Sequence, residues 1–400
     1  MRALLWSTRR RPGTRTGPVR VDNLPVIFGV VLDSAEEDWP GRNRLFERMA
    51  QLRPVVFLER RRKGSLLPRM ERLPNGSYVL RAAFGLSAAR QPEFCKRFTR
   101  RLDAALFSRA LRREGLTPYV FWLETPRPEL LDHISPAATI YDCMDPCFVP
   151  SEQAAHERRE RICVERAGIV IATAASLERR MRTFGAAPIR LPNAADERDL
   201  ESTLSYSDVR AELGLHGPVA TYLGTIDSRV DLTLLTAVAV SMPDWQFLLC
   251  GRVNHDRERE TQVLRTLPNV RITGSVDGFG GQRAIVAADV CLVPFREAPI
   301  SDAINPVKVF SYLSFGKRVV ATDIEECRTS RFVTTASGAA AFVAALKHEY
   351  LQESRSAERK AFAAANTWSI RAAEASVIID QTVGAAPAPQ SEEVTFRAVT

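Results

Sequence analysis

Short apolar runs alternate with helical stretches along most of this chain, and the alternation starts afresh near its middle. In the first half we expect strands at 25–32, 55–58, 119–123, 139–141 and 168–173. In the second half we expect them at 219–223, 245–250, 269–273, 288–294 and 318–322. Strands that alternate with helices form parallel sheets covered by helices. The sequence therefore predicts an α/β protein with two doubly wound parallel sheets.

The length of the chain also indicates two domains. Its 400 residues exceed what one ordinary hydrophobic core accommodates, and 45% hydrophobic with 26% charged residues is typical of a globular protein. We expect a linker near 195–205, between a first domain at 23–197 and a second at 206–366. We expect residues 1–22 to be a disordered basic arm and residues 385–400 a disordered tail.

The net charge of +8 and the isoelectric point near 9.3 favour an anionic partner. Charge alone allows a nucleotide-sugar, an acidic lipid headgroup or a nucleic acid. No basic ribbon rich in aromatic residues occurs, so we expect no nucleic-acid partner. No apolar run reaches the roughly 18 residues that a membrane-spanning helix needs. The first residues, MRALLWSTRRRPGTRTGPVR, lack the charge order of a signal peptide.

The seven cysteines are scattered and odd in number, which indicates reduced thiols in a cytoplasmic protein. Cys143, Cys147 and His156 lie close together in the sequence, but no second Cys/His pair accompanies them. We therefore expect no zinc site.

An arginine-rich segment covers residues 60–115. Within it, apolar residues recur every four positions, at Phe94, Phe98, Leu102, Leu106 and Ala110. This pattern predicts a basic amphipathic helix. It allows two interpretations, a packed surface helix with solvated arginines or a face that rests on an anionic membrane.

The stretch SDAINPVKVFSYLSFGKRVVAT at 301–322 predicts a short helix followed by a buried strand. Asn305 suits the N-cap and Pro306 the first helical position, and Gly316 ends the helix. Lys308 lies in the first turn, where a cation opposes the helix dipole. Because a helix N-terminus binds anions, Lys308 there suggests an external anion. The alternative is a solvated lysine on an ordinary helix.

A loop with a glycine follows the first expected strand of the second domain. Gly224 and Thr225 would let backbone N–H groups approach a phosphate, and Arg229 would add a positive charge. The alternative for Arg229 is a surface salt bridge with Asp231.

Polar residues that follow strands of the first domain are candidates for the acceptor side of a site. Asp145 is our candidate for a general base, and Asp142 would orient its loop. The alternative for Asp145 is a helix N-cap before Pro146. Trp39 and Arg42 follow the first strand, where Trp39 could also merely cover the end of the sheet.

Three segments resemble GT-B glycosyltransferases. NPVKVFSYLSFGKRVVAT at 305–322 resembles the signature P-x-K-x-x-E-Y-L-A-x-G-K-P-V-V, and RLPNAAD at 190–196 resembles a P-N-G-V-D segment. YDCMD at 141–145 resembles the segment with the catalytic aspartate of a bacterial exopolysaccharide glucuronosyltransferase, and the Y-D-x-x-D segment of teichuronic-acid-type enzymes. The resemblance implies two Rossmann-like domains that face each other across a cleft, with helix 367–384 crossing back to the first domain.

The resemblance also assigns roles to residues. Gly224, Thr225, Arg229, Asn305 and Lys308 would hold the diphosphate of a nucleotide-sugar without a metal ion. Ser311 stands where the family has a ribose-binding glutamate. Phe295 or Tyr312 would flank the base or ribose.

The sequence thus predicts a glycosyltransferase that moves a sugar from a nucleotide-sugar to a lipid-linked or polysaccharide acceptor in cell-surface glycan synthesis. The protein would be cytoplasmic and peripheral on the inner face of the membrane. With Asp145 as base the reaction would invert the anomeric centre, whereas retaining relatives need no base. The alternative is a catalytically inactive GT-B protein, which Ser311 keeps open.

Overall fold

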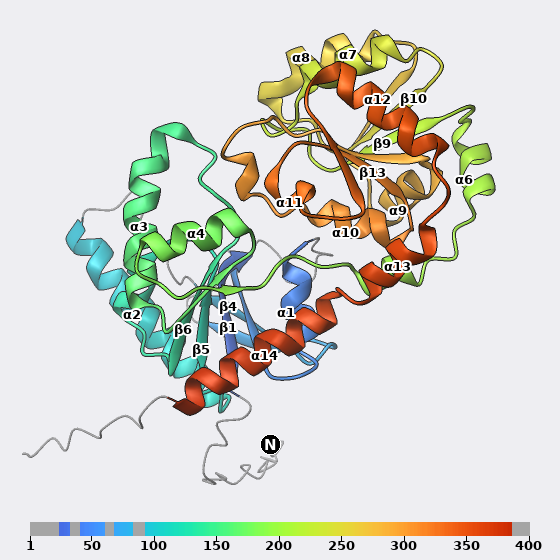
Figure 1. The fold of residues 1–400 in the computed structure, drawn as a ribbon. Coiled ribbons are helices and arrows are strands. Elements are labelled where there is room, and N and C mark those ends of the chain that lie inside the picture. Colours follow the sequence, from blue (N-terminus) through green and yellow to red (C-terminus); the bar gives the residue numbers. More distant parts are fainter. Residues whose placement is uncertain (1–23, 33–40, 61–67, 83–92, 386–400) are drawn as a thin grey trace, which may run out of the picture.

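The chain folds into two lobes, each built on one sheet (Figure 1). The computed structural model describes residues 24–32, 41–60, 68–82 and 93–385. The first sheet has the order β3-β4-β2-β1-β5-β6-β7-β8. Its strands are β1 (Val26–Leu32), β2 (Val55–Arg60), β3 (Arg69–Arg72), β4 (Tyr78–Ala82), β5 (Val120–Leu123), β6 (Ala138–Cys143), β7 (Ile169–Ala172) and β8 (Ile189–Arg190).

The second sheet has the order β11-β10-β9-β12-β13-β14. Its strands are β9 (Val219–Leu223), β10 (Gln246–Cys250), β11 (Val270–Gly274), β12 (Val290–Val293), β13 (Arg318–Thr322) and β14 (Val333–Ala336). All pairs in both sheets are parallel except β3 with β4. The prediction of two parallel sheets is confirmed, because β5, β7 and β12 are buried on both faces as their unbroken apolar runs require. The β3–β4 hairpin was not predicted.

Helices cover both sheets. Those of the first lobe are α1 (Asn43–Met49), α2 (Glu93–Arg113), α3 (Gln153–Arg166) and α4 (Ala175–Thr183), with short 3₁₀ turns η2 (Pro128–Asp132) and η3 (Pro150–Glu152). Those of the linker and second lobe are α5 (Glu197–Leu200), α6 (Tyr206–Leu213), α7 (Leu232–Ser241), α8 (Glu258–Arg265), α9 (Gly278–Ala287), α10 (Val307–Ser314), α11 (Glu325–Arg328), α12 (Gly338–Leu351) and α13 (Ser356–Ala364), with η4 (His255–Arg257) and η5 (Ser301–Ala303).

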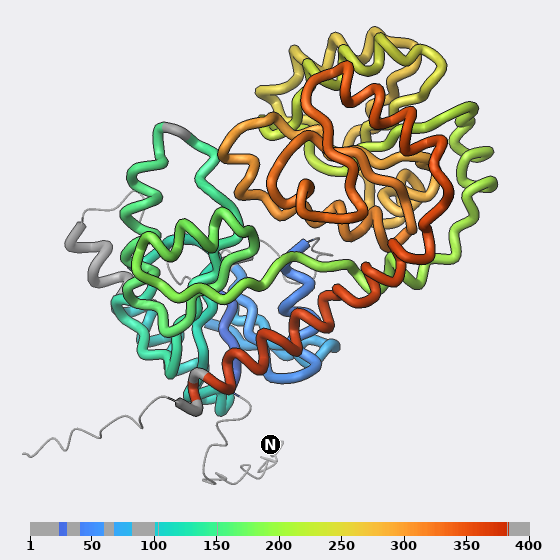
Figure 2. Tube along the Cα trace, in the orientation of Figure 1, coloured from blue at the N-terminus to red at the C-terminus, as the bar shows by residue number. Residues whose placement is uncertain are grey.

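The chain passes between the lobes twice, and the two passages run side by side (Figure 2). Ala195 pairs with Thr367 across them, and its N–H donates to the carbonyl oxygen of Asn366 at 2.8 Å. The last helix, α14 (Trp368–Ala385), then packs against α1 of the first lobe through Trp368 and Ile379. These two passages fix how the lobes face each other.

The buried face of α2 differs from the predicted one. Ala104, Phe107 and Leu111 enter the core, whereas Leu102 is 49% exposed. The reason is geometric, because residues spaced by four drift around a helix of 3.6 residues per turn. The side chains of Phe94 and Phe98 lie outside the described residues. Among the described helices, none is long and apolar enough to cross a bilayer.

Candidate functional site

The loops that follow β6 in the first lobe and β9 in the second meet between the lobes. Arg229, after β9, lies 5.5 Å from the ring centroid of Phe148, after β6. The charges of Arg229 and Asp227 also act on Asp145. Because ligands bind at the carboxyl ends of parallel strands, this meeting point is the candidate site.

Helix α10 presents its first turn to this site. It begins at Val307 with Pro306 as N-cap, so the prediction that Asn305 is the N-cap is wrong. Among the described residues, the backbone N–H groups of Val307 and Lys308 have no hydrogen-bond acceptor. A helix start with open N–H groups can accept an anion.

Two aromatic rings hold the Lys308 ammonium in place. Its Nζ donates a hydrogen bond to the hydroxyl of Tyr222 at 2.9 Å and lies 4.7 Å from the ring centroid of Phe295. Burial lowers the pKa of Lys308 to about 7, and the nearby charge of Arg229 acts in the same direction. Asp227 opposes the shift. The site therefore contains a partly desolvated cation whose charge an incoming anion would favour.

The loop after β9 lies directly beside this cation. Gly224 has φ of 140°, and a Cβ there would lie 2.9 Å from Lys308 Nζ. The carbonyl oxygen of Thr225 accepts a hydrogen bond from Tyr222 at 2.9 Å. The backbone at Gly251 approaches even more closely, since a Cβ added there would lie 1.9 Å from the carbonyl oxygen of Gly224. Glycines at these two positions let the strand ends meet under the ammonium.

Arg229 is held by Asp227 rather than by Asp231. Its Nε lies 3.0 Å from both carboxylate oxygens of Asp227. Burial raises the pKa of Asp227, but hydrogen bonds from Arg229 outweigh that effect and lower it. Asp231 caps α7 by accepting from the N–H of Leu234 at 2.8 Å. The alternative of an Arg229–Asp231 salt bridge is therefore wrong, and Arg229 keeps a fixed position beside Lys308.

The side-chain amide of Asn305 is occupied by hydrogen bonds within the protein. Its Oδ1 accepts from the N–H of Asn193 at 3.1 Å, and its Nδ2 donates to Glu326 at 2.7 Å. Glu326 also accepts from Arg190 at 2.7 Å and from the N–H of Ala175 at 2.8 Å. The side chain of Asn305 thus belongs to a network that ties the lobes together next to α10.

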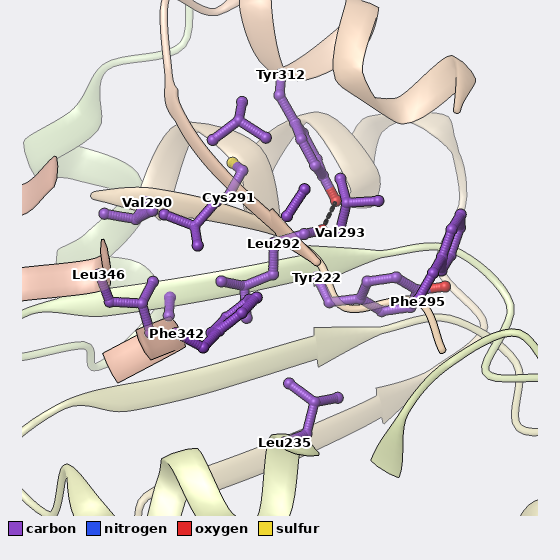
Figure 3. Packing of buried hydrophobic residues seen from close by; sticks show 14 of the residues in the cluster. Tyr222, Leu235, Val290, Cys291, Leu292, Val293, Phe295, Tyr312, Phe342 and Leu346 are labelled. Atoms are coloured by element: carbon purple, nitrogen blue, oxygen red, sulfur yellow. Dashed lines mark hydrogen bonds between the residues drawn. The ribbon is translucent and has the colours of Figure 1, made fainter. Parts of the chain in front are cut away.

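The three residues that were predicted to contact the base or ribose lie in different surroundings. Tyr312 is fully buried; its hydroxyl accepts from the N–H of Leu223 at 2.9 Å and donates to the carbonyl oxygen of Leu292 at 3.3 Å (Figure 3). Tyr312 is a core residue, so its predicted place beside the nucleotide is wrong. Phe295 is 3% exposed, and its ring centroid lies 4.7 Å from Lys308 Nζ. Burial raises the pKa of Asp199 of α5, and the hydroxyl of the neighbouring Ser311 opposes this rise.

On the facing lobe, Arg42 and Asp142 form a buried ion pair. Arg42 donates from Nε to Asp142 at 2.7 Å and from a terminal nitrogen at 2.9 Å. The indole N–H of Trp122 donates to the same carboxylate at 3.1 Å. This pair is inaccessible to a ligand and anchors the end of β6. Trp39 lies outside the described residues.

Asp145 extends beyond this anchor. The side chain of Asp145 is exposed at the surface. The protein around its carboxyl still reduces hydration and so raises the pKa of Asp145, whereas the charges of Arg229 and Arg42 oppose this rise. No helix begins directly at Asp145, since the next turn, η3, starts at Pro150. The alternative of N-capping is therefore wrong, and the exposed carboxylate is available to a ligand where the loops after β6 and β9 meet.

Sequence reasoning overlooked Tyr222, Asp227 and Glu124. Tyr222 hydrogen-bonds Lys308, and Asp227 forms an ion pair with Arg229. Asp227 could have been found from the sequence, because it is a carboxylate in the loop after a predicted strand. Glu124 directly follows the apolar run of β5 and could have been found in the same way. Among the described residues, no three His, Cys, Asp or Glu side chains are grouped to hold a metal ion.

Comparison with known proteins finds a family match in the second lobe. Residues 217–351 match the family described as Glycosyl transferases group 1. TuaH of Bacillus subtilis (strain 168), named as a teichuronic acid biosynthesis glycosyltransferase, is 28% identical over 199 residues, which cover 46% of this chain and 50% of TuaH. The chain thus matches about half the length of this relative.

Solved structures match over nearly the whole chain. Sucrose-phosphate synthase from Thermosynechococcus elongatus has a TM-score of 0.70 and 19% identity, covering 91% of this chain and 100% of its own. HepE of Anabaena in complex with UDP has a TM-score of 0.64 and 14% identity, with 90% and 100% covered. The chain therefore has the GT-B fold, and residues 217–351 of its second lobe match the family described as Glycosyl transferases group 1.

Proposed function

We propose that this protein transfers a sugar from a nucleoside-diphosphate sugar to a hydroxyl group of an acceptor. The observation that carries the proposal is the partly desolvated Lys308 at the open start of α10, beside Arg229, whose charge also acts on Asp145 of the other lobe. The proposal extends to an acceptor that is a lipid-linked or growing polysaccharide, for which the name of the relative TuaH is support.

The chemistry requires positive groups on one side and a base on the other. As the bond between the anomeric carbon and the diphosphate breaks, negative charge develops on the leaving oxygen, and Lys308 and Arg229 would stabilise it. The acceptor oxygen bonds to the anomeric carbon and its proton passes to Asp145. This route inverts the anomeric centre. In this proposal the two cations and the helix start replace a metal ion.

The nucleotide is proposed from structural neighbours. HepE has been solved with UDP and with UDP-glucose, and a trehalose-6-phosphate enzyme of E. coli with UDP-2-fluoro glucose. UDP-glucose is therefore the first donor to test. We further propose that the protein acts at the cytoplasmic face of the membrane, where the basic segment around α2 would meet anionic lipid.

The test combines a donor panel with one variant. UDP-glucose, GDP-mannose and dTDP-glucose are screened by thermal shift, and release of the nucleoside diphosphate is then measured. Lys308→Ala should weaken binding of the donor about ten- to hundredfold, because it removes one charge-assisted hydrogen bond. Lys347→Ala, an exposed lysine on α12, is the control and should leave binding unchanged.

Two results would change the assignment. Donor binding with no release of nucleoside diphosphate, even with acceptors present, would favour the inactive binding protein. Unchanged donor affinity in Lys308→Ala would place the donor elsewhere.

A further inference from the structure

Three carboxyl groups lie at the cleft edge of the first sheet. Glu124 follows β5, Asp142 lies within β6, and Asp145 is in the loop after it. Arg42 and the Trp122 indole neutralise Asp142 through three hydrogen bonds. Within the described part of the chain, no side chain hydrogen-bonds Glu124 or Asp145 in this way.

Glu124 is buried in an unusual way. It is 8% exposed, and its Oε1 has no hydrogen-bond partner among the described residues. Burying an unpartnered polar atom destabilises a fold, so each such atom calls for an explanation, of which a bound ligand is one. The four residues before Glu124, which form β5, are apolar and buried, so the carboxyl follows directly on an apolar strand.

The surroundings favour the protonated form of this carboxyl. Burial raises the pKa of Glu124 well above its ordinary value, and the charges of Asp142 and Asp145 act in the same direction, against Arg42. A protonated carboxyl can donate one hydrogen bond and accept others. A sugar hydroxyl has the same dual capacity and would satisfy it.

We propose that Glu124 binds a second hydroxyl group of the acceptor, next to the hydroxyl that Asp145 deprotonates. This inference rests on the proposed glycosyltransferase function and names its acceptor class, a saccharide with two neighbouring hydroxyl groups. Glu124 forms only a hydrogen bond; the proton released in the reaction goes to Asp145.

The same charges disfavour a phosphate as the attacking group. The described side chains that act on Glu124 are two carboxylates and one arginine, and Arg42 is already bound to Asp142. Among the described side chains that act on Glu124 no unpaired cation is found, so a lipid phosphate would meet the carboxylate of Asp145, whereas a neutral hydroxyl would not be repelled. The lipid of a lipid-linked acceptor would therefore lie away from the reacting end.

The test uses Glu124→Gln and Glu124→Met, with Glu114→Gln, an exposed carboxyl after α2, as the control. Donor is UDP-glucose, and the acceptor probes are octyl glucoside, octyl galactoside and farnesyl phosphate. Glu124→Met should raise the acceptor KM about five- to tenfold, the effect of one hydrogen bond. Glu124→Gln should recover part of this loss. UDP affinity should not change in either variant.

Stability separates a functional from a structural role. If the carboxyl is kept for the acceptor, Glu124→Met should raise the midpoint of thermal unfolding. Because the pKa is higher in the folded state than in the unfolded state, the folded protein loses stability as pH rises above about 4.5. The gain in Glu124→Met should therefore be larger at pH 8 than at pH 5. A lower midpoint with an unchanged acceptor KM would show a structural role and overturn the proposal.

The outcomes remain distinct if the proposed function fails. Should the wild-type protein neither bind UDP nor release it from UDP-glucose, the glycosyltransferase proposal is wrong. Saturation-transfer NMR with octyl glucoside then decides on Glu124 directly, since equal binding by wild type and Glu124→Met refutes the inference. Preference of the wild type for farnesyl phosphate over both glycosides would refute it as well.

Discussion

Binding of UDP-glucose should be linked to the protonation of Lys308. In the free protein, burial and the charge of Arg229 lower the pKa of this ammonium to about 7, so near neutral pH about half of the molecules carry the proton. A diphosphate beside the ammonium should return the pKa towards its ordinary value of about 10.4. Binding above pH 7 therefore requires the uptake of a proton.

The size of the effect follows from these two values. With a free pKa of about 7 and a bound value above 10, affinity should fall about tenfold between pH 6 and pH 8 and about tenfold more by pH 9. At pH 8, binding should take up about 0.9 proton per site. UDP-glucose suits the measurement because both ends of its diphosphate are esterified, so its phosphates do not titrate in this range.

The assay is isothermal titration calorimetry at pH 6, 7, 8 and 9, with two buffers of different ionisation enthalpy at pH 8. The difference in observed enthalpy between the buffers measures the proton uptake. Lys308→Met should bind more weakly and lose the dependence on pH, whereas Lys347→Ala should keep it. The reasoning is refuted if wild-type affinity stays constant from pH 6 to pH 9 and the two buffers give the same enthalpy.

Three further outcomes are expected. Asp145→Asn should lower kcat for transfer about 100-fold or more while leaving UDP affinity unchanged, measured by product formation and calorimetry; full activity would exclude Asp145 as base. Arg42→Met should destabilise the protein by about 3–5 kcal/mol in urea unfolding, because Asp142 is 0% exposed and would be left unpaired. Gly251→Ala should lower the unfolding midpoint far more than Gly185→Ala; equal effects would contradict the close approach at Gly251, since a Cβ at Gly185 meets nothing within 4 Å.

Much of the architecture could be read from local pattern. Continuous apolar runs such as that of β12 specify strands buried on both faces, and their alternation with helices requires parallel sheets. The helix that carries Lys308 was also predicted, because Pro306 and Gly316 limit a stretch of helical spacing. These features depend on neighbours within a few residues, which a single sequence records.

The composition of the site depended on contacts between distant segments. Arg229 pairs with Asp227 and not with Asp231, because the turn after β9 directs Asp231 to the start of α7. Periodicity could not tell that Tyr312 points into the core while Lys308, four residues earlier, faces the cleft.

Contacts between the two lobes cannot be predicted from any local sequence pattern. Asn305 serves the junction through Asn193, more than a hundred residues earlier, and Asp145 interacts with Arg229 of the opposite lobe. Glu124 becomes notable only when β5 lies beside β6 and brings its carboxyl towards Asp142. Strand and helix propensity are properties of short segments, whereas burial, pairing and proton affinity arise from what the folded chain places around each group.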